Sequence, residues 1–125
     1  MVKTYTKTVD ASEELVVECG FVPNVIRILN LTNGVQLYWN DQIPVEVSDG
    51  GEQYAIIGAD GALDATGDDV GYVSNTDGAL TLLDGSDKTN NLTTSFGFKL
   101  AAGTVHINDA DNEVLVIECL KVDQV

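Results

Sequence analysis

The sequence predicts an all-β fold, an antiparallel β-sandwich or jelly-roll-like barrel, formed by a single domain over residues 1–125. Apolar and polar residues alternate with the period of two that is typical of half-buried strands. Turn-forming Gly, Asp, Asn and Ser recur at intervals of roughly 8–12 residues, and no segment shows the 3.6-residue period of a helix. A chain of 125 residues has the usual size of one domain with one core.

The first strands are predicted at residues 2–9 and 14–19. VKTYTKTV alternates β-branched residues with lysines, which indicates an edge strand whose lysines face water. ELVVEC directs its Leu, the second Val and Cys inward and its second Glu outward. Gly20, Phe21 and Pro23 then predict a corner, because Pro has no N–H donor and restricts the residue before it.

A β-hairpin is predicted from residues 24–31 and 35–40. Asn33 and Gly34 lie between these segments, and Asn-Gly is a strong hairpin signal because both residues tolerate positive φ. Trp39 falls on the inward face of the second strand.

The middle of the chain, residues 41–91, is an acidic region rich in turns, with 11 acidic residues and one basic residue, Lys88. Its Gly, Asp, Asn and Ser content predicts loops, interrupted by short strands near 53–57, 72–74 and 80–83. Loops of this kind often carry contacts to partners.

Regular alternation returns in the last third of the chain and predicts strands at 92–100, 104–107 and 113–122. Phe98 is expected to pack in the core. His106, the single histidine, lies within a predicted strand and fits a core-edge or surface residue better than a general base.

Charge and hydropathy exclude several classes of partner. With 6 basic and 20 acidic residues the net charge is −14, which repels phosphate backbones and predicts no nucleic-acid binding. No apolar run approaches the roughly 18 residues that cross a bilayer, so no membrane partner is expected. The N-terminus also lacks the apolar core of a secretory signal, so we expect a soluble protein, mature from Met1 and made in the cytoplasm.

The sequence does not predict an enzyme or a cofactor. The motifs G-x-S-x-G, G-x-x-x-x-G-K and H-E-x-x-H are all missing from it. Calcium is the one ligand that the acids could serve, at 59–69 or 108–113, although neither segment has the residue order of a helical calcium loop. A sugar-stacking platform is a further alternative, but at 6% aromatic content core and interface packing is favoured for Tyr38, Trp39, Tyr54, Tyr72 and Phe98.

The two cysteines, Cys19 and Cys119, occupy the same position in the similar segments LVVEC and LVIEC. Buried free thiols are favoured, because an inward Cys behaves as a small apolar residue. A disulfide stays open as an alternative that needs neighbouring strands and an oxidising compartment. Two Cys without CxxC spacing fall short of a zinc site, and an internal repeat is excluded because the match ends after five residues.

Two segments carry a resemblance to a known family. GFVPNVIRILNLTNGVQLYW at 20–39 has a Gly-Phe-x-Pro corner, a strand ending in Asn, a Thr-Asn-Gly hairpin and a strand ending in Trp. GFKLAAGTVHINDADNEVLVIECLKV at 97–122 has Gly-Phe-x-Leu, a short strand, a tight turn and a long final strand. Both resemble small virion structural proteins of tailed bacteriophages, of the capsid decoration (cement) type.

The resemblance implies a homotrimer on the capsid surface, bound to the major capsid protein and stabilising the phage head. The alternative is a tail or fibre module that binds carbohydrate or a host receptor. It also implies that the two cysteine-bearing strands lie side by side. The residues assigned structural roles are Gly20, Phe21, Pro23, Asn33, Gly34, Trp39, Gly97 and Phe98.

Overall fold

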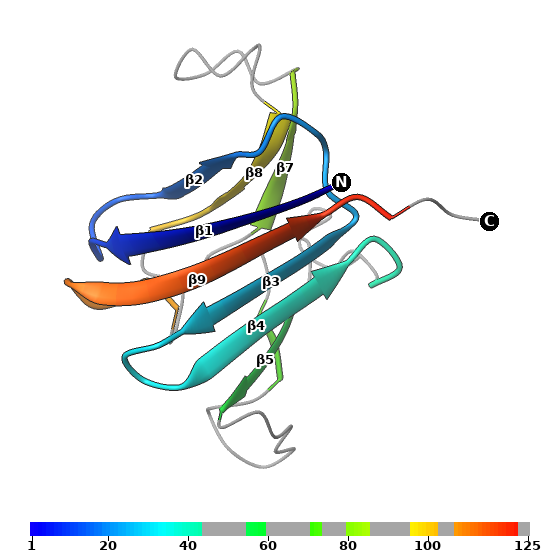
Figure 1. The fold of residues 1–125 in the computed structure, drawn as a ribbon. Coiled ribbons are helices and arrows are strands. Elements are labelled where there is room, and N and C mark those ends of the chain that lie inside the picture. Colours follow the sequence, from blue (N-terminus) through cyan, green and yellow to red (C-terminus); the bar gives the residue numbers. More distant parts are fainter. Residues whose placement is uncertain (44–54, 60–70, 74–79, 86–95, 103–106, 123–125) are drawn as a thin grey trace.

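A computed structural model of the chain describes residues 1–43, 80–85, 96–102 and 107–122, together with the backbone of 55–59 and 71–73. The described part is a β-sandwich of two antiparallel sheets (Figure 1). The strands are β1 (Val2–Val9), β2 (Leu15–Glu18), β3 (Val25–Asn30), β4 (Val35–Asn40), β5 (Ala55–Ala59), β6 (Gly71–Val73), β7 (Leu80–Asp84), β8 (Phe96–Leu100) and β9 (Glu113–Leu120).

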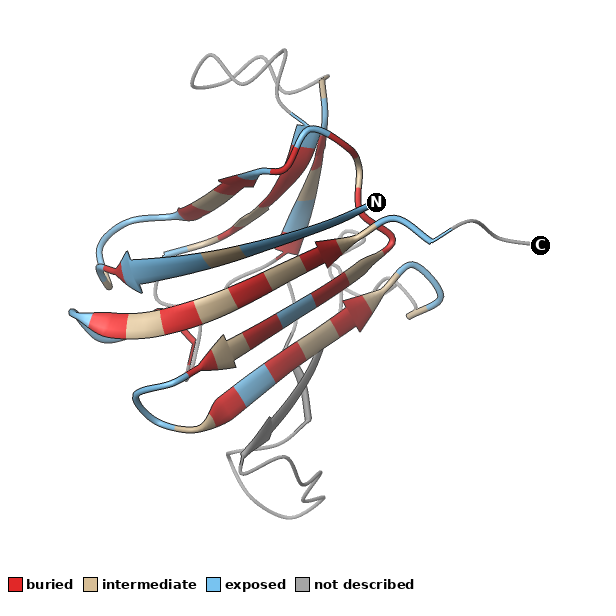
Figure 2. Cartoon of the chain, in the orientation of Figure 1, coloured by how far each residue is buried: buried red, intermediate tan, exposed pale blue. Residues whose placement is uncertain are grey.

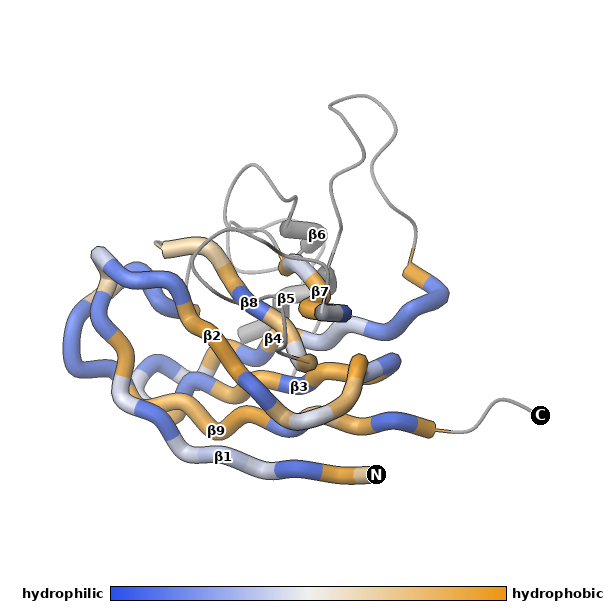
Figure 3. The backbone as a smooth tube through the Cα atoms, turned by 90° about the horizontal axis from the view of Figure 1, so that it is seen from above, coloured by the Kyte–Doolittle hydropathy of each residue, from blue (hydrophilic) through white to orange (hydrophobic). Residues whose placement is uncertain are grey.

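The predicted all-β fold is confirmed, in the form of two separate sheets. The larger sheet has the strand order β1-β9-β3-β4-β5-β6 and the smaller one has the order β2-β8-β7. Seen from above, β9 and β3 lie beneath β8 (Figure 3), and inward side chains of both sheets form one core. The chain therefore crosses to the smaller sheet after β1 and returns after β2.

Most strand bounds agree with the predicted ones or lie close to them. β1 and β4 have the predicted bounds, and β3 and β9 lie within theirs. β5, β6 and β7 overlap the three short strands expected in the acidic middle. The strand expected at 104–107 lies largely outside the described residues, while Ile107 itself falls in a turn and is buried.

Buried and more exposed residues alternate along β9, β3 and β4, so one face of the larger sheet is directed into the core (Figure 2). In β9 the inward residues Leu115, Ile117 and Cys119 are all 0% exposed. They pack with Ile28 of β3 and Leu37 of β4 in one core that also includes the inward residues of the smaller sheet. Burial of these apolar side chains is the main term that stabilises the sandwich.

Strand β1 closes one side of the sandwich. It pairs with β9 along its whole length, from Val2 opposite Leu120 to Val9 opposite Glu113. At the Val2 end of this pair the Met1 ammonium donates to the Lys121 carbonyl at 3.0 Å.

Two side chains of β1 also reach the free edge of β2. The Tyr5 hydroxyl donates to the Glu18 carbonyl at 3.4 Å, and the Lys7 ammonium donates to the Val16 carbonyl at 3.3 Å. These contacts occupy acceptors that an edge strand would otherwise present to another chain.

Candidate functional site

The predicted corner residues lie where the chain passes from the smaller sheet to the larger one. Gly20 adopts φ +86°, a backbone conformation that favours glycine, and its N–H donates to the Phe96 carbonyl at 3.0 Å. Phe21 is buried in the core, and Pro23 is also buried. After the corner the Asn24 N–H donates to the Leu120 carbonyl at 2.9 Å, which aligns the start of β3 with the end of β9.

The β3–β4 hairpin differs in detail from the predicted Asn-Gly turn. Its loop is four residues long, from Leu31 to Gly34, and Gly34 alone among them has positive φ, at 78°. The Gly34 N–H donates to the Asn30 carbonyl at 2.8 Å, and the Asn33 side chain accepts from the Val35 N–H at 2.9 Å. Asn33 thus supports the turn through its side chain and not through a left-handed backbone.

Asn30 and Glu113 form a buried polar pair that the sequence did not predict. Asn30 is 0% exposed and Glu113 is 8% exposed. The Asn30 amide donates to the Glu113 carboxylate and, at 3.0 Å, to the Ile107 carbonyl. Its oxygen accepts from the Thr32 N–H at 3.0 Å, so one side chain joins the hairpin loop to the start of β9.

Gly97, Phe98 and Trp39 belong to the packing of the core. Phe98 is 0% exposed and Trp39 is 1% exposed. Gly97 lies opposite Glu18 in the β2–β8 pair, where a Cβ would stand 1.9 Å from the Val17 carbonyl oxygen. The site accommodates glycine because the backbone of β2 takes the space of a side chain.

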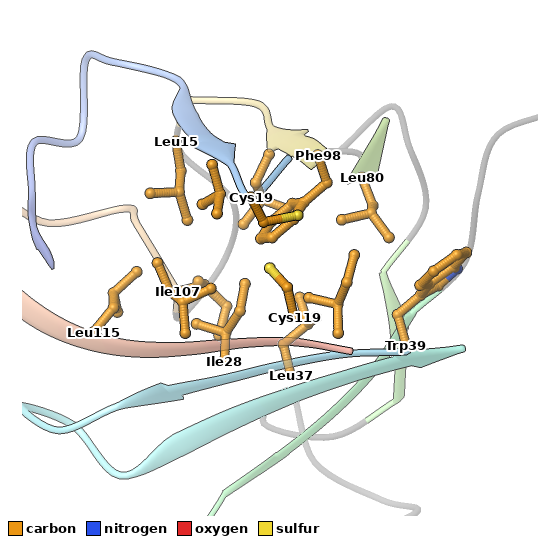
Figure 4. Close-up of a cluster of buried hydrophobic side chains, with 14 of the residues drawn as sticks. Leu15, Cys19, Ile28, Leu37, Trp39, Leu80, Phe98, Ile107, Leu115 and Cys119 are labelled. Carbon is orange, nitrogen blue, oxygen red and sulfur yellow. The ribbon is translucent and has the colours of Figure 1, made fainter. Parts of the chain in front are cut away.

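Both cysteines are free and buried, and they point toward each other across the core (Figure 4). The expected side-by-side arrangement of their strands is wrong. Cys19 follows β2 of the smaller sheet, whereas Cys119 lies in β9 between β1 and β3 of the larger sheet. The Cys19 thiol donates to the Phe21 carbonyl at 3.1 Å. Burial, followed by the neighbouring Cys19, raises the pKa of Cys119 to about 12, which makes it a poor nucleophile at neutral pH.

Several described acidic residues accept hydrogen bonds from other residues of the chain. At the candidate calcium turn 108–113, Asp111 accepts from the Ala11 N–H at 2.9 Å and Glu113 accepts from Asn30. The backbone and hydroxyl of Ser12 donate to Asp10 and lower the pKa of its carboxyl. Within the described ranges, no three His, Cys, Asp or Glu side chains gather as a metal ion would need.

Several expectations fall outside what the structure describes. These are the calcium candidate at 59–69 apart from the Ala59 backbone, His106, Tyr54, the Tyr72 side chain and most of the acidic middle.

The side of β1, β9, β3 and β4 that faces away from the smaller sheet is called the outer face here. It comprises Val2, Thr4, Thr6 and Thr8 of β1, Val114, Val116, Glu118 and Leu120 of β9, Val25, Arg27 and Leu29 of β3, and Gln36, Tyr38 and Asn40 of β4.

Strand register arranges the outer face in rows. One apolar row joins Val2, Leu120 and Val25, which are opposite one another in β1, β9 and β3. A second joins Val116 and Leu29.

The row between these two apolar rows is polar and contains Glu118, Arg27 and Tyr38. Arg27 Nη1 lies 3.6 Å from Glu118 Oε1, and the guanidinium carbon lies 5.8 Å from the centre of the Tyr38 ring. A shallow hollow of about 450 Å³ opens here, with Gln36 at its side.

No family model, curated protein or solved structure matches this chain. Within its described residues no helix is long and apolar enough to cross a membrane.

Proposed function

We propose that the chain is a virion structural protein of a tailed bacteriophage, a capsid decoration protein that binds the major capsid protein on the outer shell and stabilises the head. The observation that carries the proposal is where the two resembling segments lie. Residues 20–39 and 97–122 supply β3, most of β4, β9 and most of β8, which are the central strands of both sheets.

The polar groups buried in the described part support a structural role. Asn30 and Glu113 tie a hairpin loop to β9, and the free thiols pack in the core. A decoration protein needs a stable scaffold, because it acts by binding the assembled shell in preference to its dissociated parts. Self-association, as the homotrimer that the resemblance implies, belongs to the same proposal.

Particles that lack the protein provide the test. Heating such particles should release DNA at a lower temperature than complete particles, and adding back the purified chain should restore the higher temperature. The matched control is the chain with Gly97→Ala, whose sandwich we expect to be destabilised and which should restore less. Unchanged DNA release together with lost adsorption to the host would contradict the decoration role.

The hollow on the outer face favours a second candidate, a tail or fibre module that binds carbohydrate. Tyr38 offers an aromatic ring, and Arg27, Glu118 and Gln36 offer donors and acceptors around it. Aromatic stacking with polar groups at the rim is a common way to hold a sugar. Glycan binding that is lost in Tyr38→Ala and kept in Tyr5→Ala would support this candidate.

A further inference from the structure

The outer face differs in charge from the rest of the chain. The protein has a net charge of −14, yet the charged residues of this face are Arg27 and Glu118, one of each sign. Two copies of a strongly acidic chain repel each other, and the repulsion is weakest where their surfaces carry no net charge. The outer face is thus a surface by which copies of this chain can approach closely.

The same face is apolar beside its polar row. Val25, Leu29, Val114, Val116 and Leu120 are half-buried in the single chain, and Val2 is 60% exposed. Apolar side chains left partly exposed on one face of a sheet can be buried further by a partner. Threonines of β1 border it and add hydroxyl groups that can pair across an interface.

Arg27 has room for a second carboxylate. Its side chain is 61% exposed, and its 3.6 Å contact with Glu118 is longer than the 2.7–2.9 Å of a charge-assisted hydrogen bond. Arginine has five N–H donors in a planar fork, so one loose contact on an exposed side chain leaves donors that another acceptor can reach. An acidic partner satisfies them, and another copy of this chain is such a partner.

The area of the face suits a modest interface. Four strands about 4.8 Å apart and about 23 Å long cover roughly 440 Å² in projection. Specific interfaces bury about 800 Å² of accessible surface on each partner, and a surface with side chains exceeds its flat projection. The four strands alone thus give a small interface, typical of weak association whose population rises with protein concentration.

We propose that the outer face packs against a second copy of this chain, with its apolar rows buried in the contact and Arg27 facing a carboxylate of the other copy. This deepens the self-association included in the proposed function by naming the surface that makes it. Because the repulsion between acidic copies is screened by salt whereas apolar burial is not, association should strengthen as salt is added.

Sedimentation of the full chain over a range of concentrations tests the proposal. The wild type should form oligomers, and Val116→Glu should weaken their association at least about tenfold, which corresponds to about 1.4 kcal/mol. The matched control is Val16→Glu, the same change at a half-buried outward position of β2 in the other sheet, and it should associate like the wild type. Arg27→Glu, at an exposed position, supplies a second variant in case Val116→Glu fails to fold.

The outcomes distinguish a failure of the outer-face contact from a failure of the proposed decoration role. A wild-type chain that stays monomeric up to about 1 mM, with or without salt, overturns the proposal. Oligomers that persist in both outer-face variants refute this surface but leave self-association standing. If the wild type is monomeric and binds glycans through Tyr38, the face belongs to the carbohydrate candidate. Particle stability is measured separately and does not depend on any of these results.

Discussion

Replacement of Gly97 by alanine should destabilise the sandwich more than replacement of any exposed glycine. The new Cβ would stand 1.9 Å from the Val17 carbonyl oxygen, 3.0 Å from the Val17 carbonyl carbon and 3.1 Å from the Cys19 nitrogen. Even the weak C–H···O contacts between strands have C···O distances of about 3.3–3.6 Å. The methyl group therefore forces β2 and β8 apart by more than 1 Å, judged against that distance.

The magnitude follows from what has to move. All three contacted atoms belong to the backbone, so no side chain can rotate away. Overpacking of a core costs about 1–3 kcal/mol when side chains can adjust, and here a hydrogen-bonded strand pair must shift, so we expect a loss of at least about 3 kcal/mol. With a urea m-value of about 2 kcal/mol/M, the midpoint falls by about 1.5 M.

Gly20→Ala is the matched control. Gly20 has φ +86° and no atom within 4 Å of the added Cβ, so the substitution adds backbone strain without a clash and should cost about 1 kcal/mol. Urea unfolding can be followed by the fluorescence of Trp39, the single tryptophan, which is 1% exposed in the folded chain. A Gly97→Ala midpoint no lower than that of Gly20→Ala would refute the close approach of β2.

Three further predictions concern the buried polar groups. Because the pKa of Cys119 rises from 9.0 to about 12, the folded chain keeps a proton that the unfolded chain loses. The stability contributed by this protonated thiol is complete below pH 9 and is lost as the pH rises toward 12. Between these pH values the free energy of unfolding should fall by about 1.4 kcal/mol per pH unit. Urea unfolding measured at several pH values should show this slope in the wild type and not in Cys119→Ala. An aromatic disulfide reagent should leave Cys19 and Cys119 unmodified in the native chain and modify both in urea; rapid native labelling would contradict their burial. Asn30→Ala should lower the free energy of unfolding by about 3 kcal/mol, because it leaves the Glu113 carboxylate buried without the Asn30 donor. The double variant Asn30→Ala/Glu113→Ala tests the pair: if its loss equals the sum of the two single losses, the two side chains do not interact.

Local alternation predicted the strands because it depends on which face of a strand is buried. β9 illustrates this, since its inward Leu115, Ile117 and Cys119 are those that period two selects. Alternation carries no information about which sheet a strand joins. LVVEC and LVIEC look alike because each buries a Leu, a Val or Ile, and a Cys on one face, yet β2 and β9 lie in opposite sheets.

The buried polar pair shows a second limit of the sequence. An Asn at the end of a strand is typical of a turn, and that was the only signal at Asn30. Its partner Glu113 is 83 residues away, and one acid among 20 has no mark that sets it apart. Gly97 is a similar case: its place in a motif was visible in the sequence, but the backbone that crowds it belongs to Val17, 80 residues earlier in the chain.

The pairing of β1 with β9 determines how the sandwich would respond to mechanical force. The start of β1 and the end of β9 lie at the same end of this ladder, where Met1 and Lys121 exchange hydrogen bonds of 3.0 and 2.8 Å. Tension applied between these two points loads the bonds one pair at a time, from Val2 opposite Leu120 toward Val9 opposite Glu113. Strand β1 would then peel away like a zipper at low force, whereas pulling across opposite ends of the ladder loads every bond at once. Under load, the end of the ladder where Met1 and Lys121 lie is the mechanically weak side of this sandwich.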